Sequence, residues 1–403
     1  MAERVALVVA GAGARGAYEA GALSTLLPAL EARRQAPSLL FGTSAGALNV
    51  VALAAEADAG MEAASRNAVA LWERVQMGQV TSVVRSGLED LGGYLLQLVG
   101  ARRLFGRRAE VPSLLDTSHL AGTVAPLIDW DRLHDNVRRG VVRAVAVATT
   151  SDATGGTVVF VEKHPSVPLP PPDGRRNIVY VETRLTVEHA VASAAIPVAF
   201  RAQHVSTPRA RRGWYVDGGT RLNVPIKPAL AFDAERLAVV SSQAAVYGTA
   251  TARCGARRGG EGEPPDVFAA AALALHGLLA DRMVEDLRTL ATVNALLPQP
   301  RYRGHRRVPF VFAGPASSQQ EASIGRTAQQ QFERRIEDGG LVRHTDLWLL
   351  SHLIGGSEPT HGDLLSYLFF DPAFTTAAAR LGAQHARAAV QPLRWRTSLP
   401  DRG

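Results

Sequence analysis

The amino-acid sequence predicts an α/β fold with three layers, in which helices cover both faces of a mostly parallel central sheet and additional helices follow toward the C-terminus. Two observations predict it. Short apolar runs alternate with helical stretches over residues 5–57, and a glycine-rich turn follows each of the first two runs. Such a βαβα alternation favours a parallel sheet, because each crossover helix returns the chain to the end at which the previous strand began.

The individual elements follow from apolar periodicity and from the turn residues between them. The N-terminal elements are a strand at Val5–Ala10, a turn at Gly11–Gly16, a helix at Ala17–Arg34, a strand at Ser38–Phe41, a turn at Gly42–Gly46 and a helix at Ala47–Ala57. Further strands are expected at Val141–Thr149, Thr157–Glu162, Gly213–Val216, Leu237–Ser241 and Val308–Ala313, with an exposed loop at Pro168–Arg176. Helices are expected over most of 62–135, at Val187–Ala195, at Val267–Leu297 and over most of Gln319–Leu381.

The length of 403 residues exceeds the roughly 250–300 residues at which a single core stops growing, so we expect a core domain with an appendage. The core domain is predicted to span residues 4–243. Residues 244–265 contain almost no large apolar side chains, which is typical of a flexible loop or linker. Residues 266–390 are expected to form a mostly helical region that packs on or extends the core, and residues 391–403 a polar tail.

The chain is basic, with a formal net charge of +7 at pH 7 that comes mainly from arginine, since Lys163 and Lys227 are its only lysines. A basic surface suits nucleic acid, anionic lipid headgroups or an acidic substrate. Arginine-rich and alanine-rich usage also follows from GC-rich coding, so the charge alone selects no partner.

The sequence gives little indication of export or of membrane insertion. Cys254 is the single cysteine, so neither an internal disulfide nor a cysteine-based zinc site can form. The apolar run Val5–Ala10 breaks at Gly11 and is too short for a secretory signal. No apolar window approaches the ~20 residues that span a bilayer. We therefore expect a cytoplasmic location.

A G-x-S-x-G turn places Ser44 between a strand and a helix, which is the context that gives this motif meaning. In such a turn the serine has a strained backbone, and the glycines Gly42 and Gly46 avoid clashes. The dipole of the following helix favours negative charge at the serine. Thr43 and Ala45 complete the turn. The motif indicates a nucleophilic serine, and the alternative is a plain tight turn with a surface serine.

The first glycine-rich turn fits two chemistries. Its residues are Gly11, Ala12, Gly13, Ala14, Arg15 and Gly16. The spacing matches the G-x-G-x-x-G dinucleotide fingerprint, but that fingerprint requires an acidic residue about 20 positions later. Arg33 and Arg34 precede the second strand instead. We therefore favour an oxyanion hole built from backbone N–H groups; a turn that only needs small residues is the third possibility.

A third motif, Asp217-Gly218-Gly219, follows a strand and exposes a carboxylate that could take the proton of a serine directly. Alone, such a tripeptide is more often a turn. A Ser-His-Asp triad would need a histidine beside Ser44, and His189, His204 and His361 are the candidates. The sequence contains neither an H-E-x-x-H pattern nor an acidic calcium loop, so we expect no metal or other cofactor.

Together these motifs resemble the patatin-like phospholipase family. The segments that carry the resemblance are Val8–Gly16, Gly42–Gly46, Ser193–Pro197 and Asp217–Gly219 with Asn223 and Pro225. The resemblance covers residues 4–243 and continues more loosely to about residue 385, where Tyr367–Pro372 is similar to the C-terminal part of some bacterial members. One departure is Ala12, which stands where the family usually has glycine.

The resemblance implies a calcium-independent serine acyl hydrolase of phospholipase A or lysophospholipase type. Ser44 would attack the ester and Asp217 would act as base, forming a Ser-Asp dyad, while backbone N–H groups of the first turn hold the oxyanion. Arg15 would either position a phosphate or brace the loop. The motifs do not separate this activity from a broader carboxylesterase, from an acyltransferase, or from a catalytically silent lipid-binding protein.

A lipid substrate requires contact with an interface. Val80–Arg108 mixes apolar residues with arginines, which suits either an interfacial cap over the serine or an ordinary packed insertion. We expect a lipid or phospholipid substrate, peripheral contact with an anionic membrane surface at its inner face, and no nucleic-acid partner. The sequence leaves the oligomeric state open.

Overall fold

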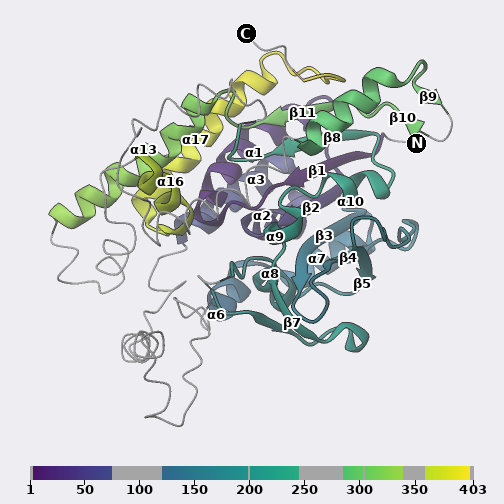
Figure 1. The fold of residues 1–403 in the computed structure, drawn as a ribbon, viewed down its shortest axis with the longest axis horizontal. Helices are drawn as coiled ribbons and strands as arrows, with labels where there is room; N and C mark the ends of the chain where they lie inside the picture. The colour runs from purple at the N-terminus through teal and green to yellow at the C-terminus, as the bar shows by residue number, and fades with distance from the viewer. Residues whose placement is uncertain are drawn as a thin grey trace, which may run out of the picture.

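A computed structural model describes residues 3–74, 120–197, 200–244, 285–302, 305–338 and 359–399. A central sheet runs through the described part, with helices on both of its faces (Figure 1). The expected segment Val80–Arg108 and, apart from Ala244, the expected loop 244–265 with Cys254 lie outside the described residues. Within the described part, no helix is both long enough and apolar enough to cross a bilayer.

The central sheet has the strand order β11-β8-β1-β2-β3-β4-β5, with β7 paired to β3 and β6 paired to β7. Pairing is parallel from β11 through β3, antiparallel between β3 and β4, and parallel again between β4 and β5. The strands are β1 Val5–Val9, β2 Leu39–Thr43, β3 Ala144–Ser151, β4 Thr157–Lys163, β5 Ile178–Glu182, β6 Gln203–Val205, β7 Gly213–Asp217, β8 Arg236–Val240 and β11 Phe310–Ala313. Arg301–Tyr302 (β9) and His305–Arg306 (β10) form a separate short ladder.

Helices connect these strands and cover the sheet. They are α1 Gly16–Glu31, α2 Ala45–Glu56, α3 Met61–Arg74, α6 Leu120–Val124, α7 Trp130–Arg138, α8 Val187–Ser193, α9 Gly219–Leu222, α10 Ile226–Ala231, α13 Ser318–Glu337, α16 Pro359–Leu368 and α17 Pro372–Val390. Short 3-10 turns occur at Gly13–Arg15, Ala57–Ala59, Ala125–Leu127 and Arg209–Arg211.

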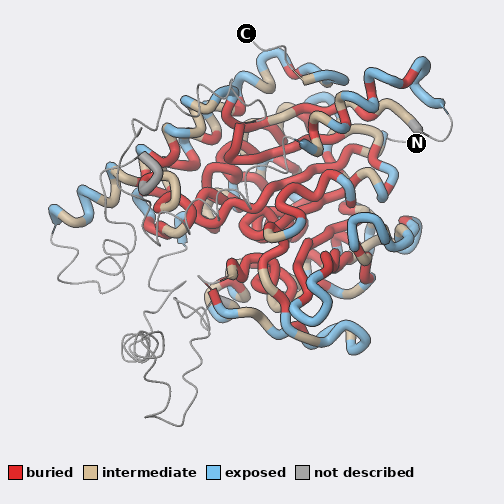
Figure 2. The backbone as a smooth tube through the Cα atoms, viewed as in Figure 1, coloured by how far each residue is buried: buried red, intermediate tan, exposed pale blue. Residues whose placement is uncertain are grey.

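Two hydrophobic clusters lie on opposite faces of the sheet, because successive strand residues point to opposite sides. Leu7 and Val9 of β1 belong to the larger cluster with α1, α2, α3 and α17. Ala6 and Val8 belong to the second cluster with α10 and the helical segment 285–296. Buried residues therefore occupy the centre of the molecule (Figure 2). The predicted three-layer α/β architecture with a mostly parallel sheet is confirmed.

The C-terminal helix α17 packs directly against α1. Two glycines allow this close approach: a Cβ added at Gly21 would overlap the Ala379 carbonyl, and one at Gly382 would overlap the Tyr18 carbonyl. Tyr18 Oη also contacts His385 Nδ1 at 2.9 Å. On the sheet, β11 pairs with β8 in register from Phe310 to Ala313. The part of the chain beyond residue 266 thus supplies both the edge strand β11 and the covering helix α17.

The structure differs from the sequence-based predictions at two places. The five-residue strand β5 was not among the predicted strands, although its run of β-branched and aromatic residues, Ile178–Val181, is typical of a strand. Residues 391–403 were expected to be a polar tail, but the described residues 391–399 return to the body of the molecule. Leu393 is buried, Trp395 Nε1 donates to Gln35 Oε1 at 2.9 Å, and Arg396 exchanges backbone hydrogen bonds with Phe310.

Candidate active site

The sheet topology brings the predicted motifs to one end of neighbouring strands. Val9 of β1 pairs with Gly42 of β2, so the turns that follow these two strands lie next to each other. A Cβ added at Gly11 would lie 3.1 Å from Ser44 Cβ and would overlap Asn223 Oδ1. Position 11 therefore has little room for a side chain, because the Asn223 side chain and Ser44 both lie against it.

Ser44 lies in a strained turn between β2 and α2. Its backbone has φ 54° and ψ −127°, a conformation that residues with a side chain rarely adopt. A Cβ at Gly42 would overlap the Gly46 carbonyl, and a Cβ at Gly46 would overlap the Ala10 carbonyl. These two clashes explain why small residues flank the serine at both positions. Ser44 is 3% exposed and precedes the first residue of α2.

Ser193, at the end of α8, holds the nucleophile turn in place. Its Oγ accepts a hydrogen bond from the Ser44 N–H at 2.8 Å and donates one to the Ala148 carbonyl at 2.6 Å. Ser193 is fully buried, and its single hydroxyl proton is committed to Ala148. The hydroxyl therefore fixes the backbone of Ser44 relative to β3. The sequence contained Ser193 within a family-like segment but gave no indication of this contact.

Asp217 ends β7 and faces the same buried site. Its N–H donates to the Ala195 carbonyl at 2.8 Å, and its Oδ1 accepts the Gly219 N–H at 2.6 Å. A Cβ at Gly218 would overlap the Ala148 carbonyl, so glycine allows the chain to pass close to β3. Oδ2 is buried and has no hydrogen-bond partner of ordinary geometry among the described residues.

The environment of Asp217 changes its acidity. Burial raises the pKa of its carboxyl to about 7, while the Ser44 side chain and the Gly219 N–H moderate that rise. A hydrogen bond to the ionised carboxylate favours ionisation, whereas loss of water opposes it, and burial is the larger effect here. A carboxyl with this pKa changes its protonation state near neutral pH, which is the property required of a general base.

Three backbone N–H groups of the glycine-rich loop already donate hydrogen bonds to backbone carbonyls. Gly11 N–H donates to the Asn223 carbonyl and Arg15 N–H to the Ala12 carbonyl, both at 3.0 Å, and Gly16 N–H donates within the same turn. Within the described chain, no backbone hydrogen bond is recorded for the N–H groups of Ala12, Gly13 and Ala14. The six predicted oxyanion residues therefore reduce to these three candidate donors.

Arg15 braces the loop from beneath. Its side chain is fully buried, and Nε donates to Ser366 Oγ at 2.6 Å while the guanidinium forms an ion pair with Asp363. The guanidinium carbon lies 4.1 Å from the centre of the Tyr367 ring. Burial lowers the pKa of Arg15, but Asp363 and its other neighbours outweigh burial and raise it overall. Because protein encloses the guanidinium, the bracing alternative for Arg15 fits better than a role in holding substrate phosphate.

Helix α16, which contains Asp363, Ser366 and Tyr367, also fixes the conformation of the loop at Gly13. This residue has φ +54°, and a Cβ there would overlap the Tyr367 carbonyl. Both observations require glycine at position 13. Helix α16, more than 340 residues along the chain, thus contacts the loop both at Gly13 and at Arg15.

The histidine candidates do not complete a triad in the described structure. His189 is buried, with Nε2 against the Thr207 carbonyl at 2.8 Å and Nδ1 against Thr186. Burial lowers its pKa, which keeps the ring neutral. His204 lies exposed on β6, and His361 is a residue of α16. Among the described residues, no three His, Cys, Asp or Glu side chains form a group that could hold a metal.

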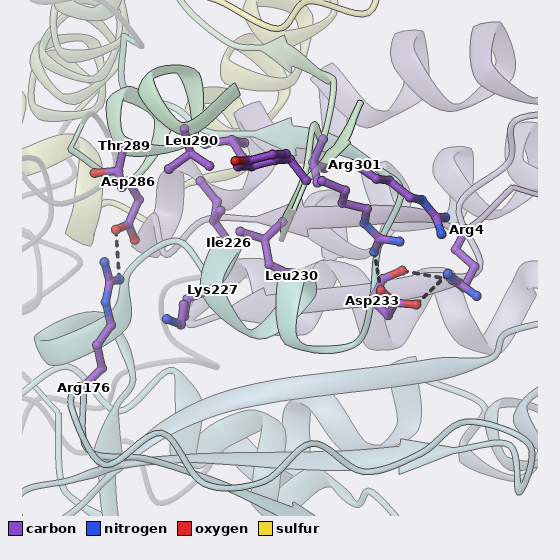
Figure 3. A pocket seen from close by; sticks show the side chains of 14 residues that line it. Arg4, Arg176, Ile226, Lys227, Leu230, Asp233, Asp286, Thr289, Leu290 and Arg301 are labelled. Atoms are coloured by element: carbon purple, nitrogen blue, oxygen red, sulfur yellow. Dashed lines mark hydrogen bonds and ion pairs between the residues drawn. The ribbon is translucent and has the colours of Figure 1, made fainter. Parts of the chain in front are cut away.

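A separate cavity of about 730 Å³ lies at the other end of the strands, near Arg4 and Val308, which precede β1 and β11 (Figure 3). Its charged side chains largely neutralise one another: Arg176 pairs with Asp286, and Asp233 pairs with Arg4 and with Arg306. Neither Ser44 nor Asp217 lines this cavity.

Comparison with known proteins gives a family. The family model described as patatin-like phospholipase matches residues 7–230. The chain belongs to the patatin-like phospholipase family. The matched residues contain the glycine-rich loop, Ser44, Ser193 and Asp217, whereas β8, β11, α16 and α17 lie beyond them. The resemblance predicted from the sequence motifs is confirmed.

Two further comparisons were made with this patatin-like chain. No curated protein matches it. Among solved structures it is similar to VipD from Legionella pneumophila, with 12% sequence identity and a TM-score of 0.30. The match covers 78% of this chain and 62% of VipD, so it spans less than two thirds of that protein.

Proposed function

We propose that the chain hydrolyses lipid acyl esters with Ser44 as nucleophile and Asp217 as general base. One observation carries the proposal: the serine of a strained strand-to-helix turn shares a buried site with a carboxyl whose pKa is about 7. At that pKa, a substantial fraction of the carboxyl is ionised at neutral pH and can accept a proton. Membership of a family of lipid acyl hydrolases supports the choice of an acyl ester as substrate.

The reaction proceeds in two halves. Asp217 takes the proton from Ser44 Oγ as that oxygen bonds to the ester carbonyl carbon, which gives a tetrahedral oxyanion. The C–O bond to the leaving alcohol then breaks, and Asp217 returns the proton to that alcohol. In the second half Asp217 deprotonates a water that attacks the acyl-serine. The bond between the acyl carbon and Ser44 Oγ then breaks, Asp217 returns the proton to Ser44 Oγ, and the carboxylic acid is released.

Stabilisation of the oxyanion is assigned to the N–H groups of Ala12, Gly13 and Ala14. Their lack of backbone acceptors among the described residues leaves them available to a ligand. Removing one such donor typically costs about 10²–10³ in rate. Ala12 donates its N–H as glycine would, so the departure from the family pattern is compatible with this role.

Lipid analysis of the purified full chain tests the activity. Wild type, Ser44→Ala and Asp217→Asn are each incubated with a diacyl phospholipid, a lysophospholipid and a soluble short-chain ester, and free fatty acid is measured. We expect release by wild type and at least about 10³-fold less by Ser44→Ala. Turnover of the soluble ester alone would favour a carboxylesterase, and transfer of the acyl group to an added lysolipid would favour an acyltransferase. No Ser44-dependent turnover of any ester would contradict the proposal and favour the silent lipid-binding alternative.

A further inference from the structure

The hairpin β6–β7 carries a cluster of exposed basic side chains. Four exposed arginines lie on or beside it: Arg201, Arg209, Arg211 and Arg212. None of them forms an ion pair with a described residue, whereas Arg4, Arg132 and Arg176 do. Two acidic residues contact the hairpin elsewhere: Glu188 accepts hydrogen bonds from Ser206, and the Asp152 N–H donates to the Trp214 carbonyl. The hairpin therefore presents a net positive surface.

An exposed tryptophan stands in the same hairpin. Trp214 is 47% exposed, and it is the one exposed tryptophan of the described residues. Its ring contacts His204, its cross-strand neighbour, with a 5.3 Å separation of ring centres. A tryptophan with an apolar body and one N–H is favoured at the boundary between lipid headgroups and hydrocarbon. Arginine and tryptophan together suit that boundary.

The hairpin is held rigidly against the body of the protein. Tyr215 is buried beside Phe160, and its Oη donates to the Arg211 carbonyl at 2.6 Å. The Thr207 carbonyl contacts His189 Nε2 at 2.8 Å. The charged turn consequently needs little ordering when it binds a partner, which lowers the entropic cost of association.

The position of the hairpin relates it to the candidate active site. Strand β7 runs from the exposed Trp214 to the buried Asp217, three residues or roughly 10 Å along a strand. In Figure 1 the hairpin extends from the edge of the molecule below β3, and Figure 2 shows exposed backbone at its turn. A surface that contacts this hairpin thus lies close to the site that contains Asp217.

We propose that the hairpin β6–β7 docks the protein on an anionic lipid surface, with the four arginines at the headgroups and Trp214 inserted at the interface. The proposal rests on the proposed lipid acyl hydrolase function, because the substrate of such an enzyme resides in a membrane. Each basic side chain near an anionic membrane strengthens binding about fivefold, and the attraction declines within a screening length of about 10 Å.

Vesicle co-sedimentation of the full chain carrying Ser44→Ala tests the docking surface without hydrolysis. We expect binding to phosphatidylcholine vesicles that contain phosphatidylglycerol, weak binding to phosphatidylcholine alone, and loss of binding at high salt. The triple change Arg209→Glu, Arg211→Glu and Arg212→Glu should weaken binding by roughly 100-fold. A matched variant with the same change in net charge, Arg139→Glu, Arg326→Glu and Arg334→Glu, alters one exposed arginine that follows α7 and two of α13, and should retain most of the binding.

The emission of Trp214 supplies a second readout. Vesicles that contain phosphatidylglycerol should shift tryptophan emission to the blue, and Trp214→Phe should abolish most of that shift. Equal loss of binding in the two triple variants, or an unchanged emission, would overturn the docking surface. So would a single-stranded oligonucleotide that binds the hairpin more tightly than the vesicles do, since arginines and aromatic rings also suit nucleic acid.

Failure of the docking surface is distinguishable from failure of the proposed function. Wild type is assayed in parallel on a soluble ester that requires no membrane. If turnover depends on Ser44 but the hairpin substitutions leave vesicle binding unchanged, only the docking surface is overturned. Hairpin-dependent binding without any turnover supports the surface and contradicts the enzyme.

Discussion

Asp217 is a buried carboxyl, one oxygen of which accepts a backbone N–H while the other has no hydrogen-bond partner of ordinary geometry among the described residues. Burial of a carboxylate is unfavourable unless it is compensated, and this lack of compensation raises the pKa to about 7. The same feature that suits a base near neutral pH also costs the protein stability. Two measurements separate these consequences.

The first prediction concerns activity. Because Asp217 must be ionised to accept the Ser44 proton, kcat/KM on a soluble ester should fall about tenfold per pH unit below an apparent pKa near 7. Above that pH the rate should reach a plateau. A profile that continues flat down to pH 5 would show that a group with an ordinary carboxyl pKa, near 4, is the base.

The second prediction concerns the free energy of unfolding. The folded-state pKa of Asp217 is raised from an unfolded value near 4, so the folded state holds its proton more tightly. The wild type therefore loses stability as the pH rises from 4 to 7, and Asp217→Asn removes that loss. Three pKa units correspond to at most about 4 kcal/mol. Urea unfolding should show the variant gaining on wild type between pH 5 and pH 8, whereas Asp131→Asn, at an exposed position, should not.

Ser193 acts on catalysis through the backbone of Ser44. Removing its hydroxyl in Ser193→Ala leaves the Ser44 N–H without an acceptor and frees the turn from β3. We expect kcat to fall roughly 10–100-fold with little change in KM, because small displacements of a nucleophile are costly. The apparent pKa of the pH profile should stay unchanged, since Asp217 is not altered. Ser65→Ala, a buried serine of α3, is the matched control for loss of stability alone.

At the scale of elements, α16 is a support for the glycine-rich loop. Asp363 balances the charge of the buried Arg15, and Asp363→Asn removes that balance. Because Asp363 is partly exposed, we expect a loss of about 2–3 kcal/mol, below the cost of breaking a fully buried pair. The rate of acylation should fall as the loop loosens. Glu62→Gln, which breaks an exposed pair with Arg66, should change stability by less than about 0.5 kcal/mol; an equal effect of both variants would contradict the bracing role.

The sequence predicted those elements whose pattern is contained in a short stretch of residues. The strand–turn–helix units around Gly11 and Ser44 were found because apolar runs and glycines stand side by side in the sequence. The packing of 391–399 was missed because it depends on partners far along the chain. Strand β6 has only three residues, too few for a periodic pattern, and β5 was missed although its residues are typical of a strand.

In the candidate site, too, some residues were predicted from sequence motifs and others were not. Ser44, Asp217 and the loop were predicted from motifs, and their roles stay predictions. The contacts of Ser193 and of α16 had no local pattern that could reveal them, because the Arg15–Ser366 hydrogen bond joins residues 351 positions apart. For Ser193, the sequence offered only its place in the segment Ser193–Pro197 that resembles the family.

At the scale of the whole molecule, the family match ends at residue 230 while the sheet does not. Strands β8 and β11 continue the sheet beside β1, and α17 covers α1. Gly382→Ala should therefore destabilise the complete protein by about 1–3 kcal/mol, because the added methyl group overlaps the Tyr18 carbonyl. Gly122→Ala, where nothing lies within 4 Å of the added Cβ, should be neutral or slightly stabilising. Thermal unfolding of both variants measures the contrast.

Covalent labelling by a fluorophosphonate, followed by peptide mass spectrometry, tests the Ser44–Asp217 dyad most directly. The probe reacts with activated serines. It should modify Ser44 in wild type, should not react with Ser44→Ala, and should react far more slowly with a folded Asp217→Asn protein. Labelling that persists at another residue in Ser44→Ala, or that proceeds at the wild-type rate in Asp217→Asn, would contradict the dyad.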